Sequence, residues 1–560
     1  MCESEWSFSS VMRKLQKRKL RTWLEDGDRL GNVSYAELQR AAFSSQHGGV
    51  EFGFCYVYLA TCPVLLHFYD LIFAYRSRKR EGPAQVEHHA EGGDGNEDNA
   101  SAAKTTAVEK TAQMVESQHG PKTEFLVLML PILALGAQPQ YLADYVALLL
   151  TGTLLLHGLL RCSRDETRPG TASPEDVAKT SSEDENGVRS ESEGLVRTEK
   201  RILTEYRAFL LCCTSLMILA VDFPSIFPRR FSKCLTEGYS PMDLGVGSFV
   251  FLNGLVVGAR WRKTLRETKN TSVAAVEQQQ QRGNQVVIKK FFRHFPTLCL
   301  GFGRFITVAV SGHHVPPEEY GLHWNFFVTL FAVHLGGDLV AFCVRRSANG
   351  LHAVAFALLG FVGYLFNVPA EFLPASDVDF RARFSWRSYA LANIEPRWNL
   401  GFLDANKEGV LSLPGFQALF LLAAALGRKG VMEVPFGAWA VGAGLPVLLL
   451  FTQSPSRRCC DVPYVLYIVS CNSFLLAALR FLNETLTHQR APLPHLLSGL
   501  QDSMLFFFLL TNVLTGCVGQ LCRTLIVPPT PAMAIVLVYG FFWMLLAQWM
   551  GKHQKKVKFW

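Results

Sequence analysis

Charge is scarce in this chain and unevenly spread. Charged residues make up only 18% of the 560 positions, whereas hydrophobic residues make up 49% and phenylalanine alone occurs 41 times. Long stretches carry almost no charge, and short stretches carry nearly all of it. Because an unpaired charge in hydrocarbon costs about 3 kcal/mol or more, this distribution argues against a soluble multidomain protein and indicates many membrane crossings.

Other familiar signals are also missing. The 14 cysteines contain no CxxC pair and lie mostly in apolar runs, which argues against a disulfide framework and predicts no metal site. The net charge of +8 sits mainly in short clusters at the ends of apolar runs, so it predicts membrane topology and no nucleic-acid partner. The first fifty residues are polar and basic, without a signal peptide, so the first membrane helix is expected to target the chain.

Hydropathy predicts an all-α, polytopic integral membrane protein with about thirteen transmembrane helices. A spanning helix needs about 20 apolar residues. The candidate segments are 53–75, 124–138, 140–160, 203–223, 242–261, 293–311, 322–344, 350–371, 411–427, 435–452, 462–482, 501–526 and 531–550. Gly245, Gly247 and Gly258 stand at intervals that would let helices pack closely.

Three polar segments divide the chain. Residues 77–123, 163–200 and 266–287 lack apolar periodicity and are predicted to be disordered. The predicted organisation is an N-terminal segment (1–52), helices 1–3 with an insertion (53–160), a linker (161–202), a core of helices 4–13 (203–551) and a basic tail (552–560). The disordered segments follow the first, third and fifth helices, so all three should lie on one side of the membrane.

Basic clusters identify that side as the cytosol. Clusters such as Arg76 to Arg80 and Arg260 to Lys263 flank it, which places the N-terminus in the lumen and the C-terminus in the cytosol. Near the C-terminus, Lys556 and Lys558 fit either a dilysine signal for retrieval to the endoplasmic reticulum or an ordinary basic tail.

One loop breaks this charge rule. The sequence LAVDFPSIFPRRFSK (219–233) should be luminal, yet it contains Arg229, Arg230 and Lys233, and it places Asp222 between apolar residues at the membrane boundary. Its prolines prevent a simple continuation of the helix, and irregular backbone at this depth survives only where it lines a cavity or packs in protein. The acid and the lysine could serve as a general base and an oxyanion stabiliser. Alternatively they merely pair, and the arginines anchor the helix at lipid headgroups.

Motifs from this loop onward carry a family resemblance. The loop is followed by MDLGVGSFVF (242–251), and TEYRAF, EYGLHWNFF, NKEGVLSLPGF and TNVLTG also occur in the expected order. From about residue 204 to its end, the chain resembles the glucosaminyl-phosphatidylinositol inositol acyltransferases of GPI-anchor biosynthesis.

The resemblance implies an enzyme of the endoplasmic reticulum membrane. Such an enzyme transfers a long-chain acyl group, typically palmitoyl, from acyl-CoA to the inositol 2-hydroxyl of glucosaminyl-phosphatidylinositol. Acyl-CoA is its co-substrate, and no other cofactor is implied. The family's catalytic aspartate and lysine carry over to Asp222 and Lys233. This chain departs from the usual pattern because DFPSIFPRR is one residue longer than the DFP-FPRR form, which alters the spacing between the two.

Further candidates surround this pair. Arg229 and Arg230 could receive the lipid phosphate through charge-assisted hydrogen bonds. Asp243, at the start of the fifth helix, either caps that helix or faces the cavity.

The motif His323, Trp324 and Asn325 opens the seventh helix. His323 could be a base, as in the membrane-bound O-acyltransferases, or the motif could support substrate binding. The alternative is a helix cap with an interfacial tryptophan.

Two stretches imitate calcium-binding EF-hand loops. The first runs from Asp26 to Glu37 with Leu30 at a ligand position, and the second begins at Asp404 with Gly415 where the bidentate glutamate belongs. Both departures argue against calcium binding.

Two other classes of protein remain open at this point. A secondary transporter would have broken helices around a central pathway, and a membrane scaffold would have no chemistry. A cavity that gathers Asp222, Lys233, Asp243 and His323 would favour the enzyme.

Overall fold

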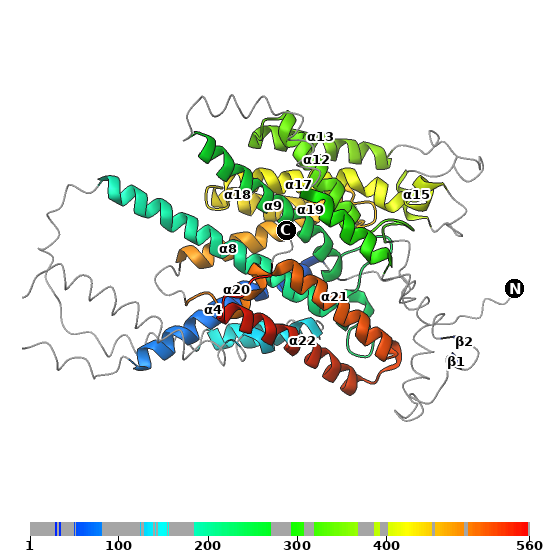
Figure 1. Cartoon of the computed structure of the whole chain (residues 1–560), viewed down its shortest axis with the longest axis horizontal. Helices are drawn as coiled ribbons and strands as arrows, with labels where there is room; N and C mark the ends of the chain where they lie inside the picture. The colour runs from blue at the N-terminus through cyan, green and yellow to red at the C-terminus, as the bar shows by residue number, and fades with distance from the viewer. Residues whose placement is uncertain are drawn as a thin grey trace, which may run out of the picture.

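The computed structural model describes residues 29–30, 33–34, 50, 52–80, 124, 128–137, 141, 144–153, 155, 184–269, 293–306, 319–367, 386–392, 401–450, 454–485 and 491–557. Two short strands, β1 (Arg29–Leu30) and β2 (Val33–Ser34), pair antiparallel. The other regular elements in these ranges are helices, which confirms the predicted all-α class (Figure 1).

Nine helices within the described residues are long and apolar enough to cross a membrane. They are α4 (Phe52–Arg80), α8 (Asp184–Ala220), α9 (Pro241–Lys269), α12 (Phe326–Cys343), α13 (Ala348–Asn367), α17 (Lys407–Lys429), α19 (Val462–Thr485), α21 (Met504–Leu521) and α22 (Pro529–Lys552). The chain is therefore a multi-pass membrane protein.

The other four predicted spans are helical over shorter described stretches. These stretches are α6 (Leu130–Ala137), residues 144–153, residues 293–306 and α18 (Phe436–Leu450). The count of thirteen stays a prediction. Short helices occupy connections at the ends of the bundle: η3 (Arg229–Phe231), α15 (Trp386–Leu391), α16 (Phe402–Ala405), α20 (His495–Asp502) and η6 (Thr524–Ile526).

The structure corrects a boundary of each predicted disordered segment: α4 continues to Arg80, α9 continues to Lys269, and α8 begins before the predicted span. Helix α8 begins at Asp184, so residues 184–202 are helical and do not belong to a disordered linker. One tertiary and one local contact stabilise the polar part of this helix: Glu199 accepts hydrogen bonds from Arg262 of α9, and Arg201 donates to Glu205 one turn later within α8. The remainder of the predicted disordered segments lies largely outside the described residues.

Small residues let the helices at the centre of the bundle approach closely. Helix α9 packs along α17, and a methyl group added at Gly258 or Gly427 would collide with a backbone carbonyl of the facing helix. A methyl group added at Gly247 would collide with the side chain of Ile468 of α19, so the predicted close packing is confirmed at Gly247 and Gly258. Gly245 instead lines a cavity.

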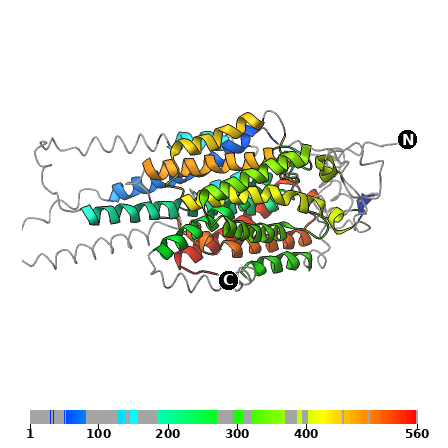
Figure 2. The same cartoon turned by 90° about the horizontal axis from the view of Figure 1, so that it is seen from above.

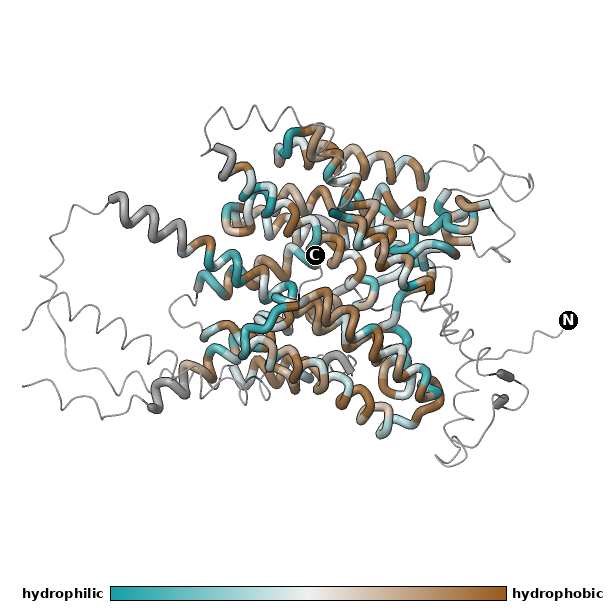
Figure 3. The backbone as a smooth tube through the Cα atoms, in the orientation of Figure 1, coloured by the Kyte–Doolittle hydropathy of each residue, from teal (hydrophilic) through white to brown (hydrophobic). Residues whose placement is uncertain are grey.

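The helices run side by side along the long axis of the molecule (Figure 2). Hydrophobic segments dominate the helices, and hydrophilic segments gather mainly toward the helix ends (Figure 3). One end contains the loop after α8 and the starts of α9, α12, α17 and α19; we call it the Asp222 end. The helix ends next to the three predicted insertions lie at the opposite end (Figure 1). This is expected if successive predicted helices cross the membrane in alternating directions.

Candidate active site

The loop after α8 is irregular but firmly packed. Helix α8 ends at Ala220, four residues before Pro224, the first of two prolines that prevent the helix from continuing. The backbone N–H groups of Asp222 and Phe223 still bond to the last turn of α8. Phe223, Phe227 and Phe231 are fully buried, and these aromatic anchors fix the path of the loop between Asp222 and Lys233.

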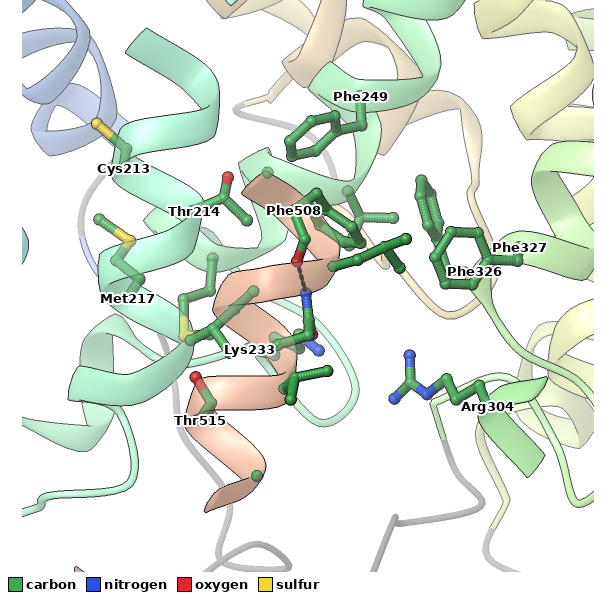
Figure 4. A pocket seen from close by; sticks show the side chains of 18 of the residues that line it. Cys213, Thr214, Met217, Lys233, Phe249, Arg304, Phe326, Phe327, Phe508 and Thr515 are labelled. Atoms are coloured by element: carbon green, nitrogen blue, oxygen red, sulfur yellow. Dashed lines mark hydrogen bonds between the residues drawn. The ribbon is translucent and has the colours of Figure 1, made fainter. Parts of the chain in front are cut away.

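A cavity of about 990 Å³ lies against this loop. Its walls come from α8, α9, α21, residues 299–304 and the start of α12, and most of the lining side chains are apolar. Asp222 and Lys233 both line it. Figure 4 shows Lys233 among Thr214 and Met217 of α8 and Thr515 of α21. The two residues predicted to be catalytic therefore share one cavity despite their altered spacing.

Asp222 has an unusual protonation equilibrium. Burial raises the pKa of its carboxyl group from the ordinary value to about 7, although the positive charges of Arg229 and Lys233 act in the opposite direction. A carboxyl group with a pKa near 7 is about half ionised at neutral pH, and its carboxylate form is basic enough to accept a proton from an alcohol. This is the property that a general base needs.

Lys233 is held by a partner that the sequence analysis did not single out. Its Nζ donates to Oε1 of Glu319 at 2.7 Å. Burial raises the pKa of Glu319, but the cations Lys233 and Arg457 outweigh that effect and lower it to about 2. Glu319 is thus ionised, and it fixes the position of the Lys233 ammonium group.

Asp243 does not line the cavity. Its carboxylate accepts hydrogen bonds from the backbone N–H of Cys234 and the hydroxyl of Ser240, both at 2.9 Å, and from Nε of Arg457 at 2.8 Å. Ser240 in turn accepts the N–H of Asp243. The carboxylate is used within the protein, so the structure assigns Asp243 to the helix start and not to substrate binding.

The arginines of the loop also lie outside the cavity lining. Arg230 is exposed, with its guanidinium carbon 5.0 Å from the centre of the Phe231 ring. Arg229 is half-buried and interacts electrostatically with Asp222, while burial lowers its own pKa. Their predicted contact with the lipid phosphate finds no support in this geometry.

The motif that opens α12 makes structural contacts. His323 is exposed, and its backbone N–H donates to Oδ1 of Asn406 at 2.6 Å. The indole of Trp324 donates to Thr329, and Asn325 caps α12 by accepting from the N–H groups of Phe327 and Val328. Asn325 thus forms the helix cap that the sequence offered as the alternative. His323, Trp324 and Asn325, predicted to bind substrate, do not line the cavity.

Two sequence motifs meet at this point. A side chain at Gly321, whose φ is +120°, would collide with Asn406, and one at Gly409 would collide with Trp324. The stretch after Asp404 forms the last turn of α16 and then α17, so it is not a calcium-binding loop. These residues join the EYGLHWNFF and NKEGVLSLPGF motifs into one support beside the cavity.

Sequence reasoning missed three charged groups of this site. Glu319 and Arg304 line the cavity, and the buried Arg457 connects electrostatically with both Asp243 and Glu319. Glu319 opens the EYGLHWNFF motif, and that was the available signal. Arg304 and Arg457 offered none beyond a charge near the end of an apolar run.

These features define a polytopic membrane protein with an acid–lysine site at the polar end of an apolar cavity. Comparison with known proteins gives its family. The GWT1 family model matches residues 39–550, and the chain belongs to that family. Similar curated proteins include GPI-anchored wall transfer protein 1 of Gibberella zeae, 31% identical over 73% of this chain and 86% of that protein. The glucosaminyl-phosphatidylinositol-acyltransferase PIGW of Mus musculus is 25% identical over 64% of this chain and 75% of its own length.

Proposed function

We propose that this protein transfers a long-chain acyl group, typically palmitoyl, from acyl-CoA to the inositol 2-hydroxyl of glucosaminyl-phosphatidylinositol. The observation that carries the proposal is the shared cavity of Asp222 and Lys233, in which a carboxylate of near-neutral pKa meets a fixed ammonium group. The name of the mouse relative supports the same acceptor and the same reaction class.

The geometry suggests a direct transfer. Ionised Asp222 accepts the proton of the 2-hydroxyl while the hydroxyl oxygen forms a bond to the thioester carbonyl carbon. Lys233, positioned by Glu319, stabilises the negative charge that develops on the carbonyl oxygen. The C–S bond then breaks, and the proton passes from Asp222 to the sulfur of the departing CoA. The step needs no cofactor beyond the co-substrate acyl-CoA.

The lining of the cavity suits lipid substrates. Its walls are mostly apolar, and α21 presents Val513, Gly516 and Leu521 at the outer surface beside it. An acyl chain buried against such walls gains about 0.8 kcal/mol per methylene group. Apolar binding energy therefore holds the chain while the polar end performs the chemistry.

We further propose residence in the endoplasmic reticulum, with the Asp222 end in the lumen and the C-terminus in the cytosol. Basic residues at the opposite end and the lysines of the tail support this orientation. A glycosylation acceptor inserted at the N-terminus and, separately, at the C-terminus tests it. Only the N-terminal acceptor should be modified in microsomes.

Reconstitution tests the reaction itself. The purified chain in lipid nanodiscs, supplied with glucosaminyl-phosphatidylinositol and labelled palmitoyl-CoA, should form a product heavier by one acyl group, detected by mass spectrometry. Absence of product from the folded wild-type protein with both substrates would refute the proposed function.

A further inference from the structure

Arg304 reaches into the cavity from a wall that carries no predicted site residue. It stands near the end of the helix at residues 293–306, and together with Lys233 it provides the cationic side chains among the described residues that line the cavity. Figure 4 shows its side chain extending toward Lys233 from the side opposite Thr214 and Met217. A substrate bound between these walls would meet both cations.

Charged side chains of both signs line this end of the cavity. Among the described residues they are Lys233, Arg304, Asp222 and Glu319. Glu319 accepts a hydrogen bond from Lys233 at 2.7 Å, and its carboxylate also feels the positive charge of Arg304. Two cations therefore face the cavity together, and an anionic substrate group placed between them would be attracted to both.

The chemistry of the proposed acceptor supplies such an anion in the right place. Its phosphodiester is attached to the inositol carbon next to the one that carries the reacting 2-hydroxyl. When that hydroxyl meets Asp222, the phosphodiester must therefore lie close by. The phosphates of acyl-CoA are separated from the thioester by the long pantetheine arm, so they lie far from Asp222 when the thioester reaches it.

We propose that Arg304 binds the phosphodiester of the acceptor lipid and so presents the 2-hydroxyl to Asp222. The inference rests on the proposed function, and it gives Arg304 the role that the sequence suggested for Arg229 and Arg230. The planar guanidinium group suits a phosphodiester because it can donate two parallel hydrogen bonds. Fixing the phosphate beside the base also explains why one hydroxyl of the ring would react in preference to the others.

Acceptor selectivity tests the assignment. Arg304→Gln should lower kcat/KM for glucosaminyl-phosphatidylinositol by about tenfold to a hundredfold, the usual effect of losing a charged hydrogen bond. The KM for palmitoyl-CoA should not change. Wild type should prefer the natural lipid over a synthetic acceptor with a neutral carbamate in place of the phosphodiester, and Arg304→Gln should lose that preference. A merely structural arginine would affect both acceptors equally.

Matched variants complete the experiment. Arg293→Gln lies on the same helix, is exposed and stands outside the cavity, about 16 Å away by helical rise, so it should behave as wild type. Arg304→Lys keeps the charge and should retain part of the selectivity.

Three results would overturn the assignment. They are unchanged selectivity in Arg304→Gln, an increased KM for palmitoyl-CoA instead of the acceptor, and a wild type that does not distinguish the two acceptors. The third needs no variant to fold. A wild type that acylates neither acceptor would refute the proposed function itself.

Discussion

The role of Asp222 as the general base can be tested by replacing one of its carboxylate oxygens with an amide nitrogen. Asp222→Asn keeps the shape of the side chain but cannot accept a proton from the acceptor hydroxyl. General-base catalysis contributes about 10²- to 10⁴-fold, so kcat should fall by that factor. The assay is the initial rate of labelled lipid formation by the purified chain in nanodiscs. Asp502→Asn, at the opposite end of the bundle, is the matched control and should remain active.

The pH dependence supplies a second, independent test. Because burial raises the pKa of Asp222 to about 7 and the base must be ionised, wild-type kcat/KM should rise with pH. At about pH 6 roughly a tenth of the carboxyl groups are ionised, so the rate should be roughly a tenth of its plateau, which begins near pH 8. The residual activity of Asp222→Asn should lack this rise.

Stability separates chemistry from misfolding. When the pKa of a carboxyl group is higher in the folded than in the unfolded state, the folded protein becomes less stable as pH rises between the two values. For Asp222 this range runs from about 4 to about 7. Asp222→Asn should therefore be at least as thermally stable as wild type at about pH 8. The assignment of Asp222 as the base is refuted if wild-type kcat/KM stays flat across this pH range, or if Asp222→Asn keeps its rate within about threefold.

Three further variants probe the charges near the base and the packing of the helices. Lys233→Met removes a cation that lowers the pKa of Asp222. Activity should fall, and the midpoint of the remaining pH profile should move to a higher pH than in wild type. An unchanged midpoint would contradict the electrostatic interaction between Lys233 and Asp222. Arg457→Met leaves Asp243 buried without its ion pair and should lower the free energy of unfolding by about 3–5 kcal/mol, measured as a drop in Tm. As the control, Lys556→Met breaks the more exposed pair with Asp502 and should cost less than about 1 kcal/mol. Gly258→Leu places a side chain against the α17 backbone and should lower Tm, while the same change at Gly360, which faces open space, should not; equal effects would disprove the close-packing argument.

The sequence by itself determined the class of the protein and the segment that matters most. Charge-free runs of membrane length predicted the helices, because hydrocarbon excludes unpaired charge regardless of how the helices later pack. The same rule exposed the loop from Asp222 to Lys233, where charge and proline interrupt an apolar pattern. Both residues line the cavity that the structure shows.

Only the tertiary structure decided which charges face the cavity. The sequence suggested Asp243 as a site residue, yet its carboxylate forms an ion pair with Arg457, which lies more than two hundred positions away. Lys233 and Glu319 are 86 positions apart and form an ion pair at 2.7 Å. Residues 184–202 were predicted to be disordered, yet they form the first part of α8, in which Glu199 bonds to Arg262 of α9. Composition and spacing describe only the neighbourhood along the chain, whereas ion pairs depend on which helix ends meet in space. For that reason Glu319 and Arg304 became visible only in the folded protein.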